Sequence, residues 1–537
     1  MNFKQKSVDV HQFAMIPKAD IPRSTFKIET AHKTTFNSGL LIPIYVEEIL
    51  PGDTYKLKMT AFARLATPIF PIMDNLHLES FFFFVPNRLL WDKWERFMGA
   101  QRDPGDTIAF TIPQFEHVGG FPIGDMGDYF GLPNEGQWTA GVTMTGNLLP
   151  WRAYALIWNE WFRDQNLQDS AYFETGDGPV VINAATYRLR RRGKRHDYFT
   201  SSLPFVQKGT AASLPLGTSA PVIPNVLDPN PQFTSTTIPN TGIRSTNPAG
   251  TMQTVSVPAG TEQLSWFYSG LTADLSSATA ATINQLRQSF QVQRLLERDA
   301  RGGTRYTEIV RAHFGVVSPD ARLQRPEFLG GGSSPININP IAQTSGTGAS
   351  GTTAPLGNLA AVGTSIANKH GFTASFTEHG YIIGMVSVRA DLTYQQGIRK
   401  LWSRQTRYDF YFPVFAHLGE QAVLSKEIYA DGTAGDNTVF GYQERFAEYR
   451  YHPSMITGRF NSRAPNTLDA WHLAQNFGLR PSLNSFFIED VPPLSRVLAV
   501  PASSTNVSAE FLLDTFFEIT AARPMPMFGV PGLVDHF

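Results

Sequence analysis

The sequence contains no cysteine in 537 residues. This absence excludes disulfide frameworks, thiolate nucleophiles, cysteine-based zinc sites and iron–sulfur clusters. No apolar run approaches the ~18 residues that a membrane-spanning helix needs. The first ten residues, MNFKQKSVDV, lack the apolar core of a secretory signal. We therefore expect a protein that is made in a cytoplasm and stays soluble.

Charge is also scarce in this chain. The 45 Lys and Arg residues nearly cancel the 46 Asp and Glu residues, which leaves a formal net charge of −1. Charged residues make up 17% of the chain, below the usual ~25%. Phenylalanine, by contrast, occurs 40 times, with 44 glycines and 37 prolines. This composition predicts a turn-rich fold whose weakly charged exterior meets other protein over much of its area.

Alternation of apolar and polar residues predicts β-strands. The predicted strands are residues 55–64, 76–85, 381–394, 408–412, 496–500 and 511–520. In the first of them, Tyr55, Leu57 and Met59 share a face opposite Lys56 and Lys58. Regular strand–helix–strand spacing is absent, so the pattern favours an antiparallel, sandwich-like sheet over a doubly wound one.

Two segments have helical periodicity and two have unusual composition. Apolar residues recur at helical spacing in residues 150–167, and a second helix is predicted at residues 277–298. Residues 209–260 are rich in Thr, Ser, Pro, Gly and Asn, and residues 328–368 contain no charged residue. We interpret both as ordered or semi-ordered surface excursions, with a flexible linker between domains as the alternative.

Catalytic templates are missing from the sequence. The HExxH, GxSxG and P-loop patterns do not occur. His379 and His417 each have a carboxylate nearby, Glu378 and Glu420, but such pairs are more typical of structural hydrogen bonds than of a metal site or an acid–base couple. We expect no enzymatic activity, no cofactor and no metal site.

One charge cluster stands apart from the rest of the chain. The candidate nucleic-acid-binding residues are Arg188, Arg190, Arg191, Arg192, Lys194, Arg195 and His196, from the run RLRRRGKRH. Tyr187, Tyr198 and Phe199 flank this run and could stack on bases while the guanidinium groups hold phosphates. A solvated loop, or a cluster neutralised by acidic groups of a neighbouring subunit, remain open as alternatives.

Seven long stretches carry a resemblance to a known family. They are VPNRLLWDKWERFMG (85–99), LIWNEWFRDQNLQ (156–168), RRRGKRHDYFTSSLP (190–204), LLERDARGGTRYTEIVRAHFGVVSPDARLQRPEFLGG (295–331), HGYIIGMVSVRADLTYQQG (379–397), FGYQERFAEYRYHPS (440–454) and RPMPMFGVPGLVDHF (523–537). These stretches resemble the major capsid protein of the gokushoviruses, small icosahedral single-stranded DNA phages of the microvirus family. The resemblance runs from one end of the chain to the other and weakens in residues 209–260 and 328–368.

The resemblance implies a mainly β fold: an eight-stranded antiparallel viral jelly roll with long loop and helical insertions, one domain over residues 1–537. It further implies a T=1 shell of sixty copies around a circular single-stranded DNA genome, with one insertion that rises at the threefold axes for host attachment. Residues 209–260 are our candidate for that protrusion, and the uncharged loop 328–368 is the competitor. The candidate threefold or attachment residues, apolar side chains that three subunits could cover together, are Val222, Ile223, Val226, Phe233 and Ile238.

Charge also bears on the partners. Sixty copies at −1 each total about −60, which cannot offset a genome of on the order of several thousand phosphates. We therefore expect a separate small, basic DNA-packaging protein, and the resemblance adds an internal scaffolding protein, a pilot protein and a host cell-surface receptor. The expected location is the virion, and the host cytoplasm during assembly. The alternative function is a β-sandwich adhesin or carbohydrate-binding protein, which the missing export signal disfavours.

Overall fold

The structure is a computed structural model. It describes residues 22–101, 103–183, 185–212, 222–224, 232–234, 243–245, 252–254, 265–268, 271–273, 283–316, 324–344, 359–499 and 509–528. The chain divides into two compact units, one formed by Met1–Val206 with Thr304–Phe537 and the other by Gln207–Gly303.

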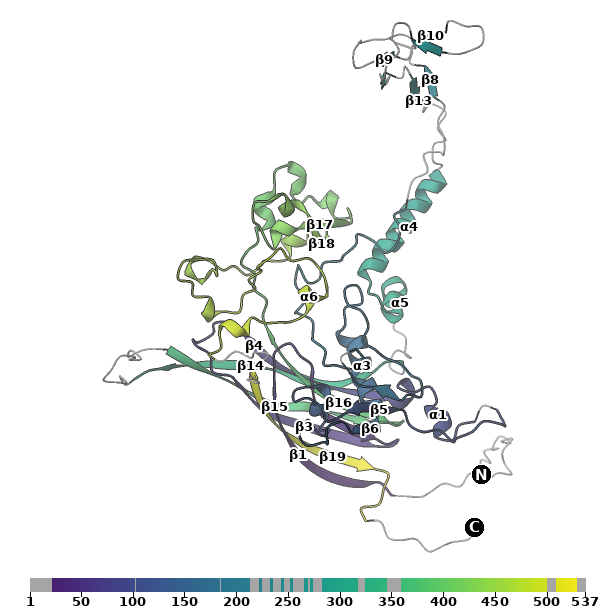
Figure 1. The fold of residues 1–537 in the computed structure, drawn as a ribbon, viewed down its shortest axis with the longest axis vertical. Coiled ribbons are helices and arrows are strands. Elements are labelled where there is room, and N and C mark those ends of the chain that lie inside the picture. The colour runs from purple at the N-terminus through teal and green to yellow at the C-terminus, as the bar shows by residue number, and fades with distance from the viewer. Residues whose placement is uncertain are drawn as a thin grey trace, which may run out of the picture. The chain divides into compact units, whose positions relative to one another are not determined.

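Eight long strands form the framework of the first unit (Figure 1). They are β1 (Ser24–Phe36), β2 (Ile42–Ile49), β3 (Thr54–Leu65), β4 (Leu76–Pro86), β14 (Glu327–Ala342), β15 (Leu359–Ser375), β16 (Gly380–Ala390) and β19 (Phe511–Arg523). Their order is β1-β19-β3-β15-β14-β4-β16-β2, and every neighbouring pair is antiparallel.

Strand β14 joins two four-stranded sheets. Its first part, Glu327–Ile336, pairs with β4, and its second part, Asn337–Ala342, pairs with β15. The first sheet is therefore β1-β19-β3-β15 and the second is β14-β4-β16-β2. Apart from the step from β4 to β14, consecutive long strands alternate between the two sheets. This connectivity is that of a jelly roll, and the predicted mainly β fold is confirmed.

The two sheets pack face to face around one apolar core. Rings from opposite sheets meet there: Tyr45 lies 5.1 Å from Phe517, and Phe82 lies 5.5 Å from Phe372, between ring centroids. Strands β3 and β19 alternate strictly between buried and exposed side chains, whereas β4 and β16 are buried on both faces. The outer face of the second sheet is thus covered by protein, and the outer face of the first sheet is open.

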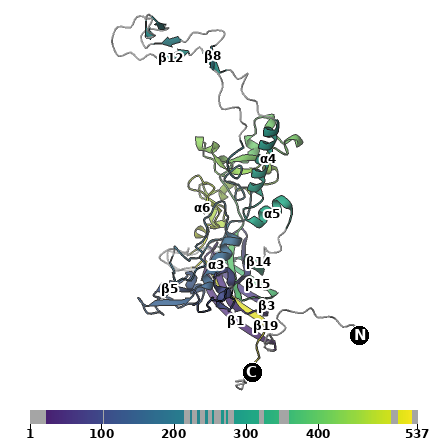
Figure 2. The same ribbon diagram turned by 90° about the vertical axis from the view of Figure 1, so that its right-hand side faces the viewer.

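Two insertions supply the rest of the first unit. The elements of the β4–β14 insertion in this unit are α1 (Trp94–Phe97), β5 (Gln114–Val118), α2 (Met126–Tyr129), β6 (Thr143–Asn147), α3 (Leu149–Ile157), the π-helical turn η2 (Trp158–Phe162), β7 (Val180–Val181) and α5 (Tyr306–Phe314). Trp151 and Tyr154 of helix α3 belong to the same apolar cluster as Phe83 of β4 and Ile383 of β16, on the outer face of the second sheet. The β16–β19 insertion contains β17 (Glu420–Leu424), β18 (Val439–Glu444), α6 (Ser485–Ile488) and several single-turn 3₁₀ helices. Within this unit, Figures 1 and 2 place β17, β18 and α6 on the side of the sandwich away from β1 and β19.

The second unit contains short strands in a nested pairing. They are β8 (Val222–Pro224), β9 (Gln232–Thr234), β10 (Ile243–Ser245), β11 (Met252–Thr254), β12 (Ser265–Tyr268) and β13 (Leu271–Ala273). Strand β8 pairs with β13, β9 with β12, and β10 with β11, so the first strand meets the last. Helix α4 (Ile283–Arg301) follows them. The predicted excursion 209–260 lies in this unit, which extends to Gly303.

The structure corrects three sequence predictions. Residues 328–368 are not a surface loop, because most of them form β14 and β15; residues 345–358 lie outside the described part. Residues 408–412 are not a strand, since a 3₁₀ turn at Arg407–Asp409 precedes exposed aromatic side chains. The described residues of 496–500 do not form a strand either: a 3₁₀ turn covers Leu494–Arg496, and Leu498 makes an isolated bridge with Pro68, while residue 500 lies outside the described part. Both predicted helices are present, as α3 with η2 and as α4.

A buried histidine ties three strands of the jelly roll together. His370 of β15 contacts the hydroxyl of Ser80 on β4 through Nδ1 (2.8 Å) and that of Ser334 on β14 through Nε2 (3.1 Å). Burial lowers the pKa of His370, because a charged imidazole is poorly solvated there.

The free energy of unfolding should therefore decrease as the pH falls below ~6.5. In that range His370 binds a proton in the unfolded chain but stays neutral in the folded protein. His370 can change the free energy of unfolding by at most ~1.4 kcal/mol per pH unit. This change stops once the pH is below the pKa of His370 in the folded state, where both states bind the proton. Urea unfolding between pH 7.5 and 5.5 measures it, with His370→Gln as the comparison. An equal slope in that variant would assign the pH dependence to other groups.

Candidate functional site

The basic segment, residues 188–196, lies against the outer side of the second sheet. Arg192 forms an ion pair with Glu79 of β4, and its guanidinium lies over the rings of Phe81 (4.5 Å) and Phe162 (5.8 Å). Glu79 also accepts from Arg389 of β16 at 2.9 Å. Arg192 and Glu79 are largely buried, so this contact is a structural ion pair within one chain.

Electrostatics in this cluster follow from burial. Desolvation lowers the pKa of Arg192 to about 10. For Glu79, burial alone would raise the pKa, but the nearby Arg192 and Arg389 outweigh it and the pKa is lowered. The carboxylate is thus held ionised by its cationic neighbours, and the stability that it contributes is lost as the pH falls through its lowered pKa.

Lys194 is buried in a second part of the same cluster. Its ammonium lies 4.5 Å from the ring centroid of Phe487, on α6, and its backbone N–H donates to the carbonyl of Ile488 at 2.7 Å. Burial lowers the pKa of Lys194 to about 8. Burial likewise raises the pKa of the adjacent Asp490 to about 7, against the pull of the surrounding cations. Lys194 therefore holds the β16–β19 insertion and is not directed at solvent.

The other cations of the basic segment form two groups, those that contact another residue of the chain and those that do not. Arg190 lies over Trp158 at 5.1 Å, Arg191 donates to the Ser38 carbonyl at 3.4 Å, and Arg195 pairs with Asp391 at 3.1 Å. Arg188 and His196 are exposed and make no hydrogen bond or ion pair with the residues that the structure describes. Carboxylates of the same chain thus neutralise part of the cluster, an arrangement that the sequence prediction did not include.

The aromatic residues that flank the segment do not offer stacking surfaces. Tyr187, Tyr198 and Phe199 are buried, the first beneath α3 and the others in the core of the β16–β19 insertion. Tyr198 also donates to Glu427 at 3.1 Å. The expectation that they stack on bases is therefore wrong, because packing within the chain already covers their rings.

The candidate attachment residues are only partly described. Val222 and Ile223 lie on β8, where the side chain of Val222 is exposed, and Phe233 lies on β9. Val226 and Ile238 fall outside the described residues. The structure brings β8 and β9 into the same nested unit but tests no threefold contact.

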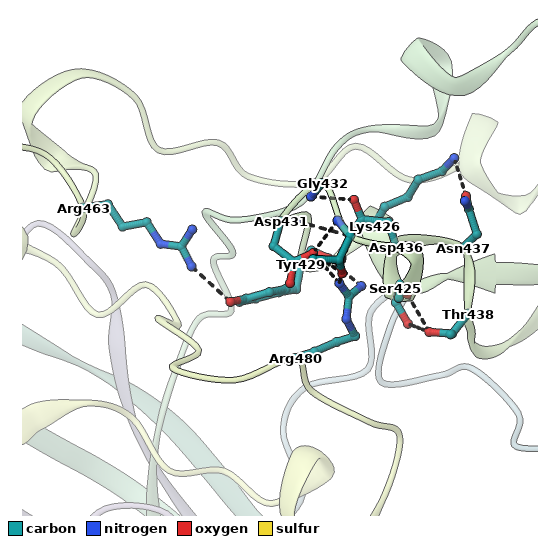
Figure 3. Close-up of polar contacts among 12 residues, drawn as sticks. Ser425, Lys426, Tyr429, Asp431, Gly432, Asp436, Asn437, Thr438, Arg463 and Arg480 are labelled. Atoms are coloured by element: carbon teal, nitrogen blue, oxygen red, sulfur yellow. Dashed lines mark hydrogen bonds and ion pairs between the residues drawn. The ribbon is translucent and has the colours of Figure 1, made fainter.

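An arginine organises the loop between β17 and β18. Figure 3 shows Arg480 directed at Asp431 (2.7 Å) and Asp436 (2.9 Å), while Arg463 reaches the hydroxyl of Tyr429 (3.4 Å). The guanidinium of Arg480 thus neutralises both carboxylates and holds the loop between β17 and β18 together. Across the described ranges, no group of three metal-ligating side chains occurs.

The largest feature that the sequence prediction missed is an exposed aromatic surface, residues 398–418. Its exposed apolar side chains are Ile398, Leu401, Trp402, Tyr408, Phe410, Tyr411, Phe412, Val414 and Leu418. Trp402 is 77% exposed and Val414 80%. From beneath, Arg404 lies between Phe410 (5.4 Å) and Tyr449 (4.3 Å) and pairs with Glu448. One side of these rings therefore packs on the chain, while a large part of each ring stays exposed among the described residues.

No helix in the described residues is long and apolar enough to cross a bilayer. The aromatic surface, residues 398–418, is an exposed apolar patch. Patches of this composition, rich in Trp, Tyr, Phe and Arg and poor in Lys and Glu, are typical of contacts between proteins.

Comparison with known proteins gives a consistent result along the chain. Residues 14–533 match the family model described as "Capsid protein (F protein)". The chain is 48% identical to "Capsid protein VP1" of Bdellovibrio phage phiMH2K over 538 residues, which cover 98% of both chains. It is 39% identical to "Capsid protein VP1" of Chlamydia phage 1 (99% of both chains) and 38% identical to that of Spiroplasma virus 4 (98% of both).

Proposed function

The chain belongs to the capsid protein (F protein) family, and from this premise we propose that sixty copies form a T=1 icosahedral shell around a circular single-stranded DNA genome. As a capsid protein of the microvirus type, it is a structural component of the virion that associates with further copies of itself. The number of copies in the shell, the enclosed DNA and the partner proteins are part of what we propose.

The aromatic surface carries the proposal. A subunit that stayed single in solution would leave nine large apolar side chains in water between residues 398 and 418. Contact with another copy removes that surface from water at ~25 cal/mol per Å² of apolar area. The exposed apolar side chains that are unfavourable in water on an isolated subunit therefore favour association of many copies.

The second unit is separate from the jelly-roll unit, and its composition suits a role in attachment. It interrupts the β4–β14 insertion, and its predicted excursion 209–260 carries two charged residues, Asp228 and Arg244. We assign host attachment to this unit, through a host cell-surface receptor. Most residues of the segment 328–368 belong to strands β14 and β15, which favours residues 209–260 for this role.

The charge arithmetic supports the other proposed partners. A chain of net charge −1 cannot neutralise the genome, so a small basic DNA-packaging protein supplies cations, while an internal scaffolding protein and a pilot protein act with the shell. Assembly takes place in the host cytoplasm. Within the basic segment, Arg188 and His196 are the side chains free to contact DNA phosphate.

Expression of the chain with the other proteins of its phage tests the proposed function. We expect hollow or filled spheres of uniform size in electron micrographs, and sixty subunits per particle from particle mass. Nuclease-protected circular single-stranded DNA should be recovered from filled particles. Single molecules alone, or shells that protect only duplex DNA, would contradict the proposal.

A further inference from the structure

The open face of the first sheet combines charge with exposed aromatic rings. Outward side chains on β1, β19 and β3 lie side by side in five rows: Lys27–Thr520–Lys56, Glu29–Glu518–Lys58, Ala31–Phe516–Thr60, Lys33–Asp514–Phe62 and Thr35–Leu512–Arg64. In this face the strands are paired in register over their full length. The side chains therefore project from a rigid lattice with fixed spacing.

Cations on this face exceed anions, although the whole chain has a net charge of −1. Five cations (Lys27, Lys33, Lys56, Lys58 and Arg64) stand against three carboxylates (Glu29, Asp514 and Glu518). Lys33 neutralises Asp514 in an ion pair. Lys27, Lys56, Lys58 and Arg64 form no ion pair with any described residue and are exposed.

Two exposed rings lie between these cations. Phe62 is 47% exposed and Phe516 is 40% exposed, and neither ring stacks on another ring of the described chain. A hollow of about 580 Å³ next to Phe62 is lined by Lys33 and Arg64 and also by the carboxylates of Asp128 and Asp514. A second hollow, of about 250 Å³, is lined by Lys27, Lys56 and Lys58 together with the carboxylates of Glu29 and Glu518.

We propose that this open face binds the single-stranded DNA cargo, with bases stacked on Phe62 and Phe516 and phosphates held by Lys27, Lys56, Lys58 and Arg64. This inference rests on the proposed function as a DNA-enclosing shell. From Lys56 to Arg64 the face extends ~27 Å at ~3.4 Å per residue. Unpaired bases stack on aromatic side chains regardless of sequence, and neighbouring cations follow the backbone.

The opposite side of the sandwich offers a different surface. The basic segment packs on the outer face of the second sheet, where Glu79 and Arg389 already hold Arg192. A closed shell presents one side of each sandwich to its interior. DNA contact at the open face and DNA contact at Arg188 and His196 are therefore alternatives that one experiment can separate.

Ultraviolet cross-linking of intact, DNA-filled particles, followed by peptide mass spectrometry, is that experiment. We expect nucleotide adducts on the peptides that contain Phe62 and Phe516. Adducts confined to residues 188–196, or to any other peptide, would overturn the inference. Zero-length carboxylate–amine cross-links from Glu29 or Glu518 to another protein would identify a protein on this face and overturn it too. Particles that lack single-stranded DNA would instead overturn the proposed function.

Binding by variants of the full-length chain provides the second measurement. The triple variant Lys56→Gln, Lys58→Gln, Arg64→Gln should bind an oligothymidylate at least tenfold more weakly in fluorescence anisotropy. Its log–log salt dependence should be shallower by about 2, from three lost phosphate contacts at ~0.7 each. The variant Arg188→Gln, His196→Gln tests the alternative site, and it should lose less affinity and less salt dependence than the triple variant. Circular dichroism verifies that the variants fold, and the reverse pattern of losses would overturn the inference.

Discussion

Replacing Glu79 with glutamine is expected to lower the free energy of unfolding by about 3–5 kcal/mol, the usual effect of breaking a buried ion pair from one side. Glu79 is the shared acceptor of Arg192, Arg389 and Arg195. Its removal leaves two largely buried guanidinium groups facing each other, with Asp490, whose own pKa burial raises to about 7, as the acid left beside them. Urea unfolding of the purified chain, followed by tryptophan fluorescence, measures the change.

The matched control is Glu444→Gln. Glu444 also pairs with an arginine, Arg450, but both side chains are exposed. Exposed pairs contribute ~0–1 kcal/mol, so this variant should unfold at nearly the wild-type denaturant concentration. If both variants behaved alike, the cluster around Glu79 would be no more than a solvated set of charges, as in one of the alternatives for the basic segment.

This result also affects how the basic segment is tested for DNA contact. A variant that replaces Arg190, Arg191 and Arg192 together would remove the Glu79 partner along with any phosphate contact. Loss of genome from such particles could not be separated from loss of stability. Arg188 and His196, which have no partner in the described part of the chain, avoid that difficulty.

The fold was predictable where local pattern and burial agree. Strands β3 and β19 have one buried and one exposed face, so alternation of residues such as Leu57 and Lys58 identified them. Strand β14 was not recognised, because Gly331 and Gly332 read as loop residues. In the structure a side chain at Gly331 would meet the carbonyl oxygen of Ser80, and one at Gly332 would meet the ring of His370. Glycine is needed at both positions because atoms of the neighbouring strands lie too close for a side chain.

The functional surfaces were less predictable, because they depend on contacts between distant residues. Glu79 lies 113 positions from Arg192 and 310 from Arg389 in the sequence. The sequence therefore shows that each residue is charged but not that the three form ion pairs. Residues 408–412 alternate aromatic and polar residues as a half-buried strand does, which led to the wrong assignment. The alternation of Tyr408, Phe410 and Phe412 instead belongs to a surface that this subunit leaves uncovered.

Replacing Trp402 and Tyr408 together with alanine is expected to abolish shell formation while leaving the subunit folded. Trp and Tyr at the centre of protein contacts commonly contribute 2 kcal/mol or more each, and a loss of ~4 kcal/mol per contact weakens it roughly 10³-fold. Both side chains are exposed, so their loss creates no cavity and the thermal midpoint of the single subunit should stay within a few degrees of wild type.

Sedimentation velocity under assembly conditions separates shells from subunits in this experiment. Ile123→Ala serves as the control, since Ile123 is exposed but lies outside the aromatic surface, and this variant should assemble normally. Normal assembly by the double variant would show that residues 398–418 face solvent or another partner in the particle. In that case the subunit contacts would have to come from other exposed apolar side chains, and the observation that carries the proposed assembly would be lost.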